Sequence, residues 1–169
     1  MKLKRQTRFW IAAALLLAAA GAASAGDVTV KYQDPDKFSD VPFFEPDRDQ
    51  VLKELTAHFE QLARQLPANQ QLAITVTDID LAGRVEPRRR SMQDIRILRG
   101  GADWPTMQLQ YTLQQDGKVI ASGSDRLSNM LYLDQMNRYA GSDSLRYEKP
   151  MVDDWFKKNF GAPAQLSSK

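Results

Sequence analysis

The stretch MQLQYTLQQDGKVIASGSDR, residues 107–126, decides the fold that the sequence predicts. Its first half alternates apolar and polar residues, which is the pattern of a β-strand with one buried face. Asp116 and Gly117 then form an Asp-Gly pair, a strong signal for a two-residue hairpin turn. Residues 118–126 are therefore expected to return antiparallel to the first strand. The apolar positions of that first strand are Met107, Leu109, Tyr111 and Leu113.

Further strands and two helices are predicted around this hairpin. Leu72, Ile74 and Val76 alternate with small or polar residues and indicate a strand with one strongly apolar face. Apolar residues at helical spacing predict helices over 47–66 and 150–160. The fold class is therefore α+β, a single domain whose antiparallel-rich sheet carries about two main helices on one face. Shorter strands are expected over 28–32 and 94–98, and the segment 128–147 leaves room for one short helix.

Residues 1–25 have the parts of a secretory signal peptide. A basic head precedes twelve apolar residues, FWIAAALLLAAA, and an Ala-x-Ala ending at Ala25. A retained membrane anchor is the alternative, but a spanning helix needs about 20 apolar residues, and this run reaches that length only if its small-residue end is counted. We expect cleavage after Ala25, a periplasmic protein without a membrane span, a domain over 26–161 and a flexible tail over 162–169.

Composition narrows the classes of function. The chain has no cysteine, which removes disulfides and thiolate chemistry. Loss of residues 1–25 takes away four of the 23 basic residues and none of the 21 acidic ones, so the exported chain carries 19 minus 21, or −2. That balance gives no reason to expect a nucleic-acid partner. The sequence holds no phosphate loop, dinucleotide fingerprint or metal-ligand constellation, so we expect no cofactor.

The motif TDIDLAG, residues 77–83, places Asp78 and Asp80 one residue apart. Asp78 continues the apolar phase of the preceding strand whereas Ile79 falls out of phase, which indicates a bulge or a strand end at Asp78. An aspartate there commonly accepts hydrogen bonds from backbone N–H groups, and Gly83 would supply a turn. Two alternatives stay open, because paired carboxylates also bind hard cations or divide acid and base roles.

His58 is the only histidine of the chain. A Ser-His-Asp arrangement would have to use it, but no GxSxG elbow occurs. Zinc sites normally use more nitrogen or sulfur ligands than one imidazole. We therefore interpret His58 as a boundary residue of an amphipathic helix, and we assign no catalytic residue and no metal ligand.

Arg88, Arg89 and Arg90 form a candidate anion contact. They lie within residues 84–99, which contain six arginines and two acidic residues and so carry a local charge of +4. The guanidinium fork suits phosphate, so a phosphate-bearing envelope component is one interpretation. The alternative is a solvated loop, or one that faces the acidic segment 27–54 of its own chain.

Four motifs occur in a fixed order: DPDKFSD (34–40), TDIDLAG (77–83), LSNMLYL (127–133) and YEKPMVDDWF (147–156). Together they resemble the domain of unknown function 3016 family, uncharacterised exported bacterial proteins, over nearly all of the exported chain. In the family's pattern an acid often follows the serine, where this chain has Asn129. The resemblance implies a signal peptide, a small α+β domain and an envelope address, but no activity. It also implies that Asp78, Asp80 and Gly83 matter to the fold or to a shared site.

Two hypotheses for the function follow. The first is a non-enzymatic accessory or binding module that acts on another envelope component, because the sequence assembles no catalytic set. The second is a metal-dependent or carboxylate-based hydrolase centred on Asp78 and Asp80, because these two carboxylates would share a face if the strand continued.

Overall fold

The computed structural model describes residues 26–86, 95–101 and 103–161. In chain order the elements are β1 (Asp27–Tyr32), η1 (Pro35–Lys37), α1 (Glu45–Ala63), β2 (Gln70–Asp80), β3 (Arg84–Glu86), β4 (Ile95–Ile97), β5 (Thr106–Gln115), β6 (Lys118–Ser128) and α2 (Glu148–Phe160). Four of the strands form one sheet in the order β1-β2-β5-β6, and β3 pairs with β4 in a separate ribbon.

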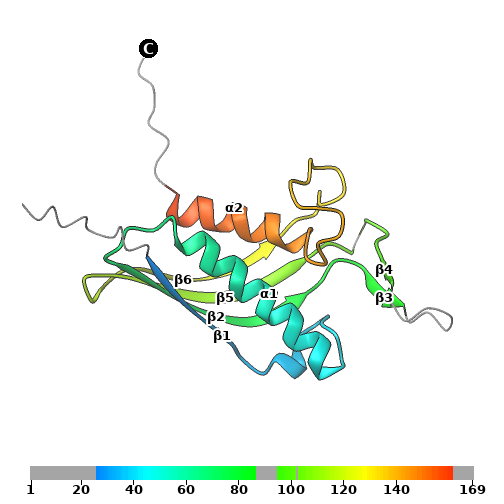
Figure 1. Ribbon diagram of the computed structural model, residues 1–169, viewed down its shortest axis with the longest axis horizontal. Helices are drawn as coiled ribbons and strands as arrows, with labels where there is room; N and C mark the ends of the chain where they lie inside the picture. The colour runs from blue at the N-terminus through cyan, green and yellow to red at the C-terminus, as the bar shows by residue number, and fades with distance from the viewer. Residues whose placement is uncertain (1–25, 87–94, 102, 162–169) are drawn as a thin grey trace, which may run out of the picture.

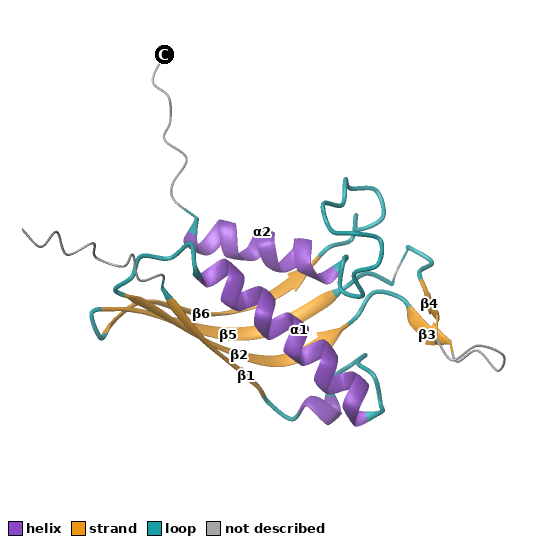
Figure 2. Ribbon diagram, in the orientation of Figure 1, coloured by secondary structure: helices purple, strands orange, loops and turns teal. Residues whose placement is uncertain are grey.

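Both long helices cover the same face of the four-stranded sheet (Figures 1 and 2). β1 is parallel to β2, whereas the β2–β5 and β5–β6 pairs are antiparallel. The predicted α+β class is therefore confirmed. α1 begins at Glu45, two residues before the predicted start, with Pro46 in its first turn. The described segment 129–147 consists of turns and loops, so the short helix for which it left room does not form.

The Asp-Gly turn joins β5 to β6 as predicted. Asp116 has φ 49° and Gly117 has φ 76°, so both residues occupy the left-handed region that a tight hairpin turn requires. Beyond the turn the two strands stay paired from Lys118 to Ser128, with one irregularity between Leu113 and Gln114.

The core lies between the helices and the sheet. Leu55 and Phe59 of α1 and Val152 of α2 are buried against apolar side chains from alternate positions of β2 and β5. The period-2 pattern of the strands and the helical stripes predicted these faces, because each element can bury only one of them. The main sheet contributors are Leu72, Ile74, Val76, Met107, Leu109 and Leu113.

The opposite face of the sheet is polar, and no described helix covers it (Figure 2). Gln108 and Gln110 of β5 and Ser122 and Ser124 of β6 are exposed there. Among the residues that the structure describes, no helix combines the length and the apolar character needed to cross a membrane.

Candidate functional site

The aspartates of TDIDLAG lie at the end of β2, next to a bulge. The register of β2 against β5 shifts between Val76 and Asp78, as the break in the apolar phase predicted. Asp78 accepts two hydrogen bonds from Ser39, one from its backbone N–H to Oδ1 at 2.7 Å and one from its hydroxyl to Oδ2 at 2.8 Å. Both carboxylate oxygens of Asp78 thus hold the loop that follows η1.

The next residue of that loop, Asp40, pairs with the end of β2. Its N–H donates to Ile79 O at 3.0 Å, and its carbonyl accepts from Leu81 N at 3.1 Å. Burial raises the pKa of Asp40, and the charge of Asp80 raises it further. Burial likewise raises the pKa of Asp80, with Asp78 as the next cause. The charge of Asp80 thus disfavours the ionised form of Asp40, and the charge of Asp78 disfavours that of Asp80.

Beyond Asp80 the chain turns through Ala82 and Gly83, and charged side chains hold both backbone N–H groups. Ala82 N donates to Oε1 of Glu148 at 3.0 Å, and Gly83 N donates to Oδ1 of Asp103 at 3.2 Å. Gly83 has φ 79°, a conformation that favours glycine. The turn is thus fixed by residues distant in sequence.

Glu148 is buried at the start of α2 and is paired with Arg96 of β4. The guanidinium of Arg96 also donates to the carbonyls of Ala82 and Ser144. This ion pair joins the β3–β4 ribbon to α2, and the hydrogen bonds of its two side chains to Ala82 attach the turn that follows β2.

Three of the four sequence motifs meet at this end of the sheet. The first contributes Ser39 and Asp40, the second the segment 78–83, and the last Glu148. The contacts among them are hydrogen bonds within the protein, and Arg96, which lies outside the motifs, adds an ion pair with Glu148. The described residues include no group of three or more His, Cys, Asp or Glu side chains that could hold a metal ion. Arg88, Arg89 and Arg90 lie outside the described residues, so the anion contact stays a prediction.

We expect Asp78→Asn and Asp80→Asn to change stability in opposite directions at neutral pH. Asparagine at 78 keeps one acceptor for Ser39 and loses the other, so the free energy of unfolding should fall by about 1 kcal/mol. Asparagine at 80 removes a charge that the folded state disfavours, so that energy should rise by less than about 1 kcal/mol. Thermal melting of both variants measures this.

The expected gain in stability from Asp80→Asn can be checked by its dependence on pH. Because the pKa of Asp80 is raised on folding, its favourable contribution is present below the unfolded pKa and is lost as pH rises through the folded pKa. The gain from Asp80→Asn should therefore vanish in acid. A melting temperature that divalent ions raise in the wild type and in neither variant would instead support a metal site.

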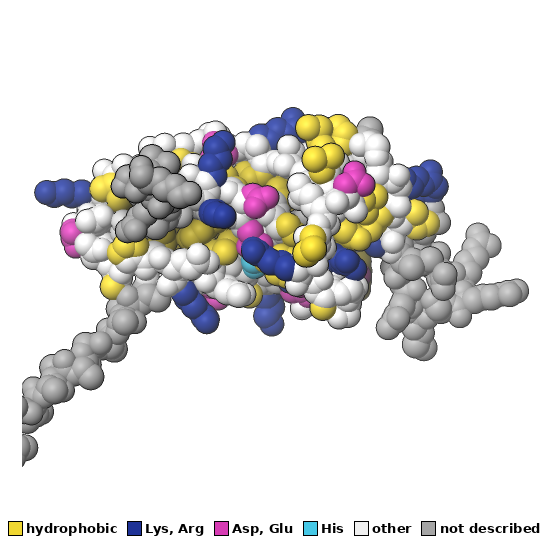
Figure 3. All heavy atoms as spheres, turned by 90° about the horizontal axis from the view of Figure 1, so that it is seen from above, with side chains coloured by type: hydrophobic (Ala, Val, Ile, Leu, Met, Phe, Trp, Pro, Cys, Tyr) yellow, Lys and Arg dark blue, Asp and Glu magenta, His cyan; other side chains and the backbone are white. Residues whose placement is uncertain are grey.

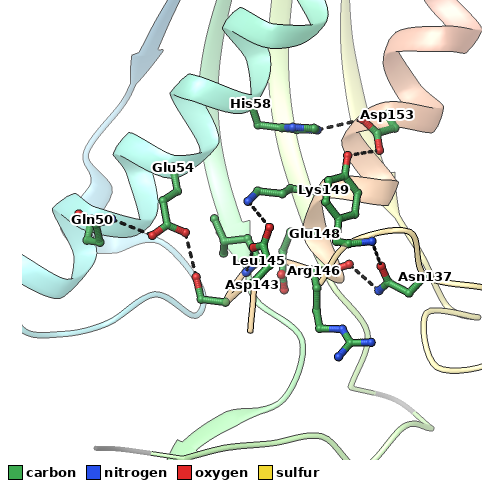
Figure 4. Close-up of polar contacts among 12 residues, drawn as sticks. Gln50, Glu54, His58, Asn137, Asp143, Leu145, Arg146, Glu148, Lys149 and Asp153 are labelled. Atoms are coloured by element: carbon green, nitrogen blue, oxygen red, sulfur yellow. Dashed lines mark hydrogen bonds and ion pairs between the residues drawn. The ribbon is translucent and has the colours of Figure 1, made fainter. Parts of the chain in front are cut away.

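A second polar cluster lies between the helices and includes His58. Figure 4 shows His58 of α1 and Asp153 of α2 pointing toward each other, with Nε2 and Oδ1 at 2.9 Å. Asp153 Oδ2 accepts a hydrogen bond from the Tyr139 hydroxyl at 2.6 Å and forms an ion pair with Arg138. His58 is only 5% exposed, so its interpretation as a boundary residue was wrong.

Tertiary contacts explain that error. Asp153 lies among buried α2 positions, between Val152 and Trp155, and it supplies the polar partner that a buried imidazole needs. A sequence signal existed, since an aspartate inside an apolar stripe requires a partner, but nothing in the sequence paired it with His58.

The carboxylate of Asp153 stays ionised in this cluster. Burial by itself would raise the pKa of Asp153, but hydrogen bonds from His58, Tyr139 and Arg138 outweigh it and hold the pKa below its ordinary value. Burial and the neighbouring carboxylate raise the pKa of Tyr139 to about 12, so its hydroxyl remains a donor at neutral pH.

We expect Asp153→Asn to lower the free energy of unfolding by about 2 kcal/mol at neutral pH, because charge-assisted hydrogen bonds are lost. A carboxyl group whose pKa is depressed on folding contributes stability above its unfolded pKa and loses it as pH falls through the folded pKa. The difference between variant and wild type should therefore shrink in acid. Urea unfolding at neutral and acidic pH measures it, with exposed Asp154→Asn as the matched control.

A third feature is an apolar loop, defined here as residues 130–136. Met130, Leu131, Leu133 and Met136 are 64%, 58%, 46% and 100% exposed. Tyr132, between them, is buried, and its hydroxyl accepts a hydrogen bond from Gly100 N at 3.2 Å. Hydrophobic side chains gather on the face seen in Figure 3, toward the end of the molecule that carries this loop.

The sequence matches one family model, described as Protein of unknown function (DUF3016), over residues 26–158. The chain belongs to the DUF3016 family. This match agrees with the order of the four motifs. Within this DUF3016 protein, three of those motifs converge on the end of β2, and the remaining one contains most of the apolar loop.

A solved structure shows a weaker likeness. It is the crystal structure of protein XCC0632 from Xanthomonas campestris, whose family model is DUF330. The sequence identity is 14%, the alignment covers 80% of this chain and 81% of that chain, and the TM-score is 0.33. A TM-score of 0.33 is too low to transfer any property of that protein to the DUF3016 protein. No curated protein matches the sequence.

Proposed function

We propose that this DUF3016 protein is an exported, non-enzymatic binding module of the cell envelope that contacts a partner through the apolar loop. The observation that carries the proposal is the exposure of four large apolar side chains on seven consecutive residues. Contiguous exposed apolar patches on a protein surface commonly mark interaction sites, because water disfavours them. The signal-like residues 1–25 support export.

The segment that carries the apolar loop is fixed to the fold at Tyr132, within the loop, and again just past the end of the loop. Tyr132 is buried and meets the ring of Tyr147 edge to face, with the ring centroids 5.2 Å apart. Past the loop, Asn137 Nδ2 donates to the carbonyl of Arg146 at 2.7 Å, and Tyr139 bonds to Asp153. A surface that is ordered before binding loses less conformational entropy when a partner binds.

The polar clusters support a binding role over catalysis. Both carboxylate oxygens of Asp78 accept hydrogen bonds from Ser39, and Glu148 forms an ion pair with Arg96. The carboxylate of Asp153 is hydrogen-bonded to His58. A catalytic carboxylate or imidazole needs a face open to its substrate. In this protein the hydrogen bonds and ion pairs of these side chains instead connect one element of the fold to another.

Photo-crosslinking in cells that export the protein tests the proposal. A crosslinking residue at Met136 should yield an adduct with one discrete envelope protein, whereas one at exposed Gln110 on the uncovered sheet face should yield none. With the crosslinker at Leu133, Met136→Gln should remove the adduct and leave the melting temperature unchanged. Absence of a discrete adduct at both Leu133 and Met136 would overturn the proposal.

A carboxylate-based hydrolase centred on Asp78 and Asp80 is the second candidate. The raised pKa of Asp80 favours it, since carboxyl groups whose pKa is raised by burial and by a neighbouring carboxylate are common in acid–base sites. This candidate requires that Asp80→Asn abolish an enzymatic activity while the melting temperature stays nearly unchanged. An activity that survives the substitution would exclude it.

A further inference from the structure

We propose that two copies of this chain pair through the open edge of β6, in an antiparallel and two-fold symmetric arrangement centred on Ser124. The inference does not depend on the proposed function. It starts from the sheet order, in which β6 is an edge strand of eleven residues and the opposite edge, β1, has six. An edge strand presents unpaired backbone groups that can pair with another strand.

The register shows which backbone groups of β6 point outward. Asn129 N donates to Pro105 O, and Leu127 and Gly123 lie opposite Met107 and Tyr111. In an antiparallel pair, residues that bond to the neighbouring strand alternate with residues that do not. From Ala121 onward, past the irregularity, odd-numbered residues of β6 therefore bond to β5. The N–H and C=O groups of Ser122, Ser124 and Arg126 face the open edge.

The middle of this edge is accessible to another strand. Ala121, Ser122, Gly123 and Ser124 have small side chains, and β6 contains no proline that would remove a donor. Natural edge strands are usually protected by proline or by charged side chains. In β6 the charged residues stand toward its ends or, as with Asp125, accept a hydrogen bond from Trp155 Nε1 within the same chain.

Both ends of the edge carry exposed apolar side chains. Val119 and Ile120 are 59% and 52% exposed at the start of β6, and Met130 is exposed just past its end. Antiparallel pairing about Ser124 sets the start of one β6 beside the end of the other. Val119 of each copy then lies opposite Asn129 of the second copy and Ile120 opposite Ser128, next to Met130, so both apolar patches lie at the interface.

The side chains also fit this register. With Ser124 at the symmetry axis, Ala121 lies opposite Leu127 of the second copy and Gly123 lies opposite Asp125, so small residues meet large ones. Centring on Asp125 or Arg126 would set two like charges opposite each other, which destabilises a strand pair. The Ser124 register avoids this and is self-complementary, as a two-fold interface must be.

Sedimentation equilibrium of the protein purified after export tests the pairing, with Ser124→Glu and Ser124→Lys as paired variants. The wild type should sediment at twice the monomer mass in the micromolar range. Each variant alone should sediment as a monomer, because like charges meet at the axis. An equimolar mixture of the two should return to twice the monomer mass, and this recovery also shows that both variants are folded.

Gln110→Lys is the matched control, because Gln110 lies opposite Ser124 on β5, one strand inside the edge. It should leave the mass doubled. A wild type that sediments as a monomer, charged variants that remain dimers, or a mixture that stays monomeric would each overturn the proposal. The pairing involves Met130 of the apolar loop but neither Leu133 nor Met136, and the proposed partner of that loop is tested at those two residues.

Discussion

Glu148→Ala is expected to lower the free energy of unfolding by about 3–5 kcal/mol, because it leaves the partly buried guanidinium of Arg96 without its carboxylate. The same change removes the acceptor of Ala82 N, and Ala82 is fully buried. An unsatisfied buried donor adds its own desolvation penalty. Urea unfolding monitored by tryptophan fluorescence measures the loss.

Two further variants separate the contributions to the stability loss of Glu148→Ala. Glu148→Gln keeps an oxygen for Ala82 N and loses only the ionic part of the pair, so it should fall between wild type and Glu148→Ala. Asp154→Ala removes an exposed acid from the same helix and should change stability by less than about 0.5 kcal/mol. If Glu148→Ala were as mild as Asp154→Ala, the ion pair would not be what joins β2, β4 and α2.

Gly83→Ala is expected to lower the free energy of unfolding by about 3 kcal/mol, from backbone strain together with a steric clash. At φ 79° a side chain is already unfavourable. A Cβ there would lie 2.3 Å from the carbonyl oxygen of Ile97, and because that atom belongs to the backbone, no rotamer change relieves the contact. The β3–β4 ribbon would have to move away from the turn.

Gly117→Ala separates strain from clash. Gly117 has nearly the same positive φ, 76°, but no atom of the described residues that could clash lies within 4 Å of where its Cβ would stand. It should therefore show only the strain, roughly 1 kcal/mol. Equal losses for the two alanine variants in chemical denaturation would mean that the close approach of Ile97 has no energetic consequence.

Local patterns predicted the part of the candidate site that depends on strand phase. The shift of apolar residues from Val76 to Ile79 indicated a bulge or a strand end at Asp78, because successive side chains of a strand alternate between two faces. The structure has the bulge, and β2 continues to Asp80. The partner of Asp78 was not predictable in this way. Ser39 lies 39 residues earlier in the chain, on a loop whose position follows from the parallel pairing of β1 with β2.

What the sequence determined by itself is which face of each element is buried. Alternation in β5, the Asp-Gly turn and the helical stripes are local, and each restricts the backbone or the exposed surface of its own segment. Tertiary structure alone decided the polar partners. Glu148 meets Ala82 across 66 residues and His58 meets Asp153 across 95. Periodicity specifies which residues of an element are buried. Which polar side chains then meet depends on the angle at which two packed elements cross, and many crossing angles bury the same faces.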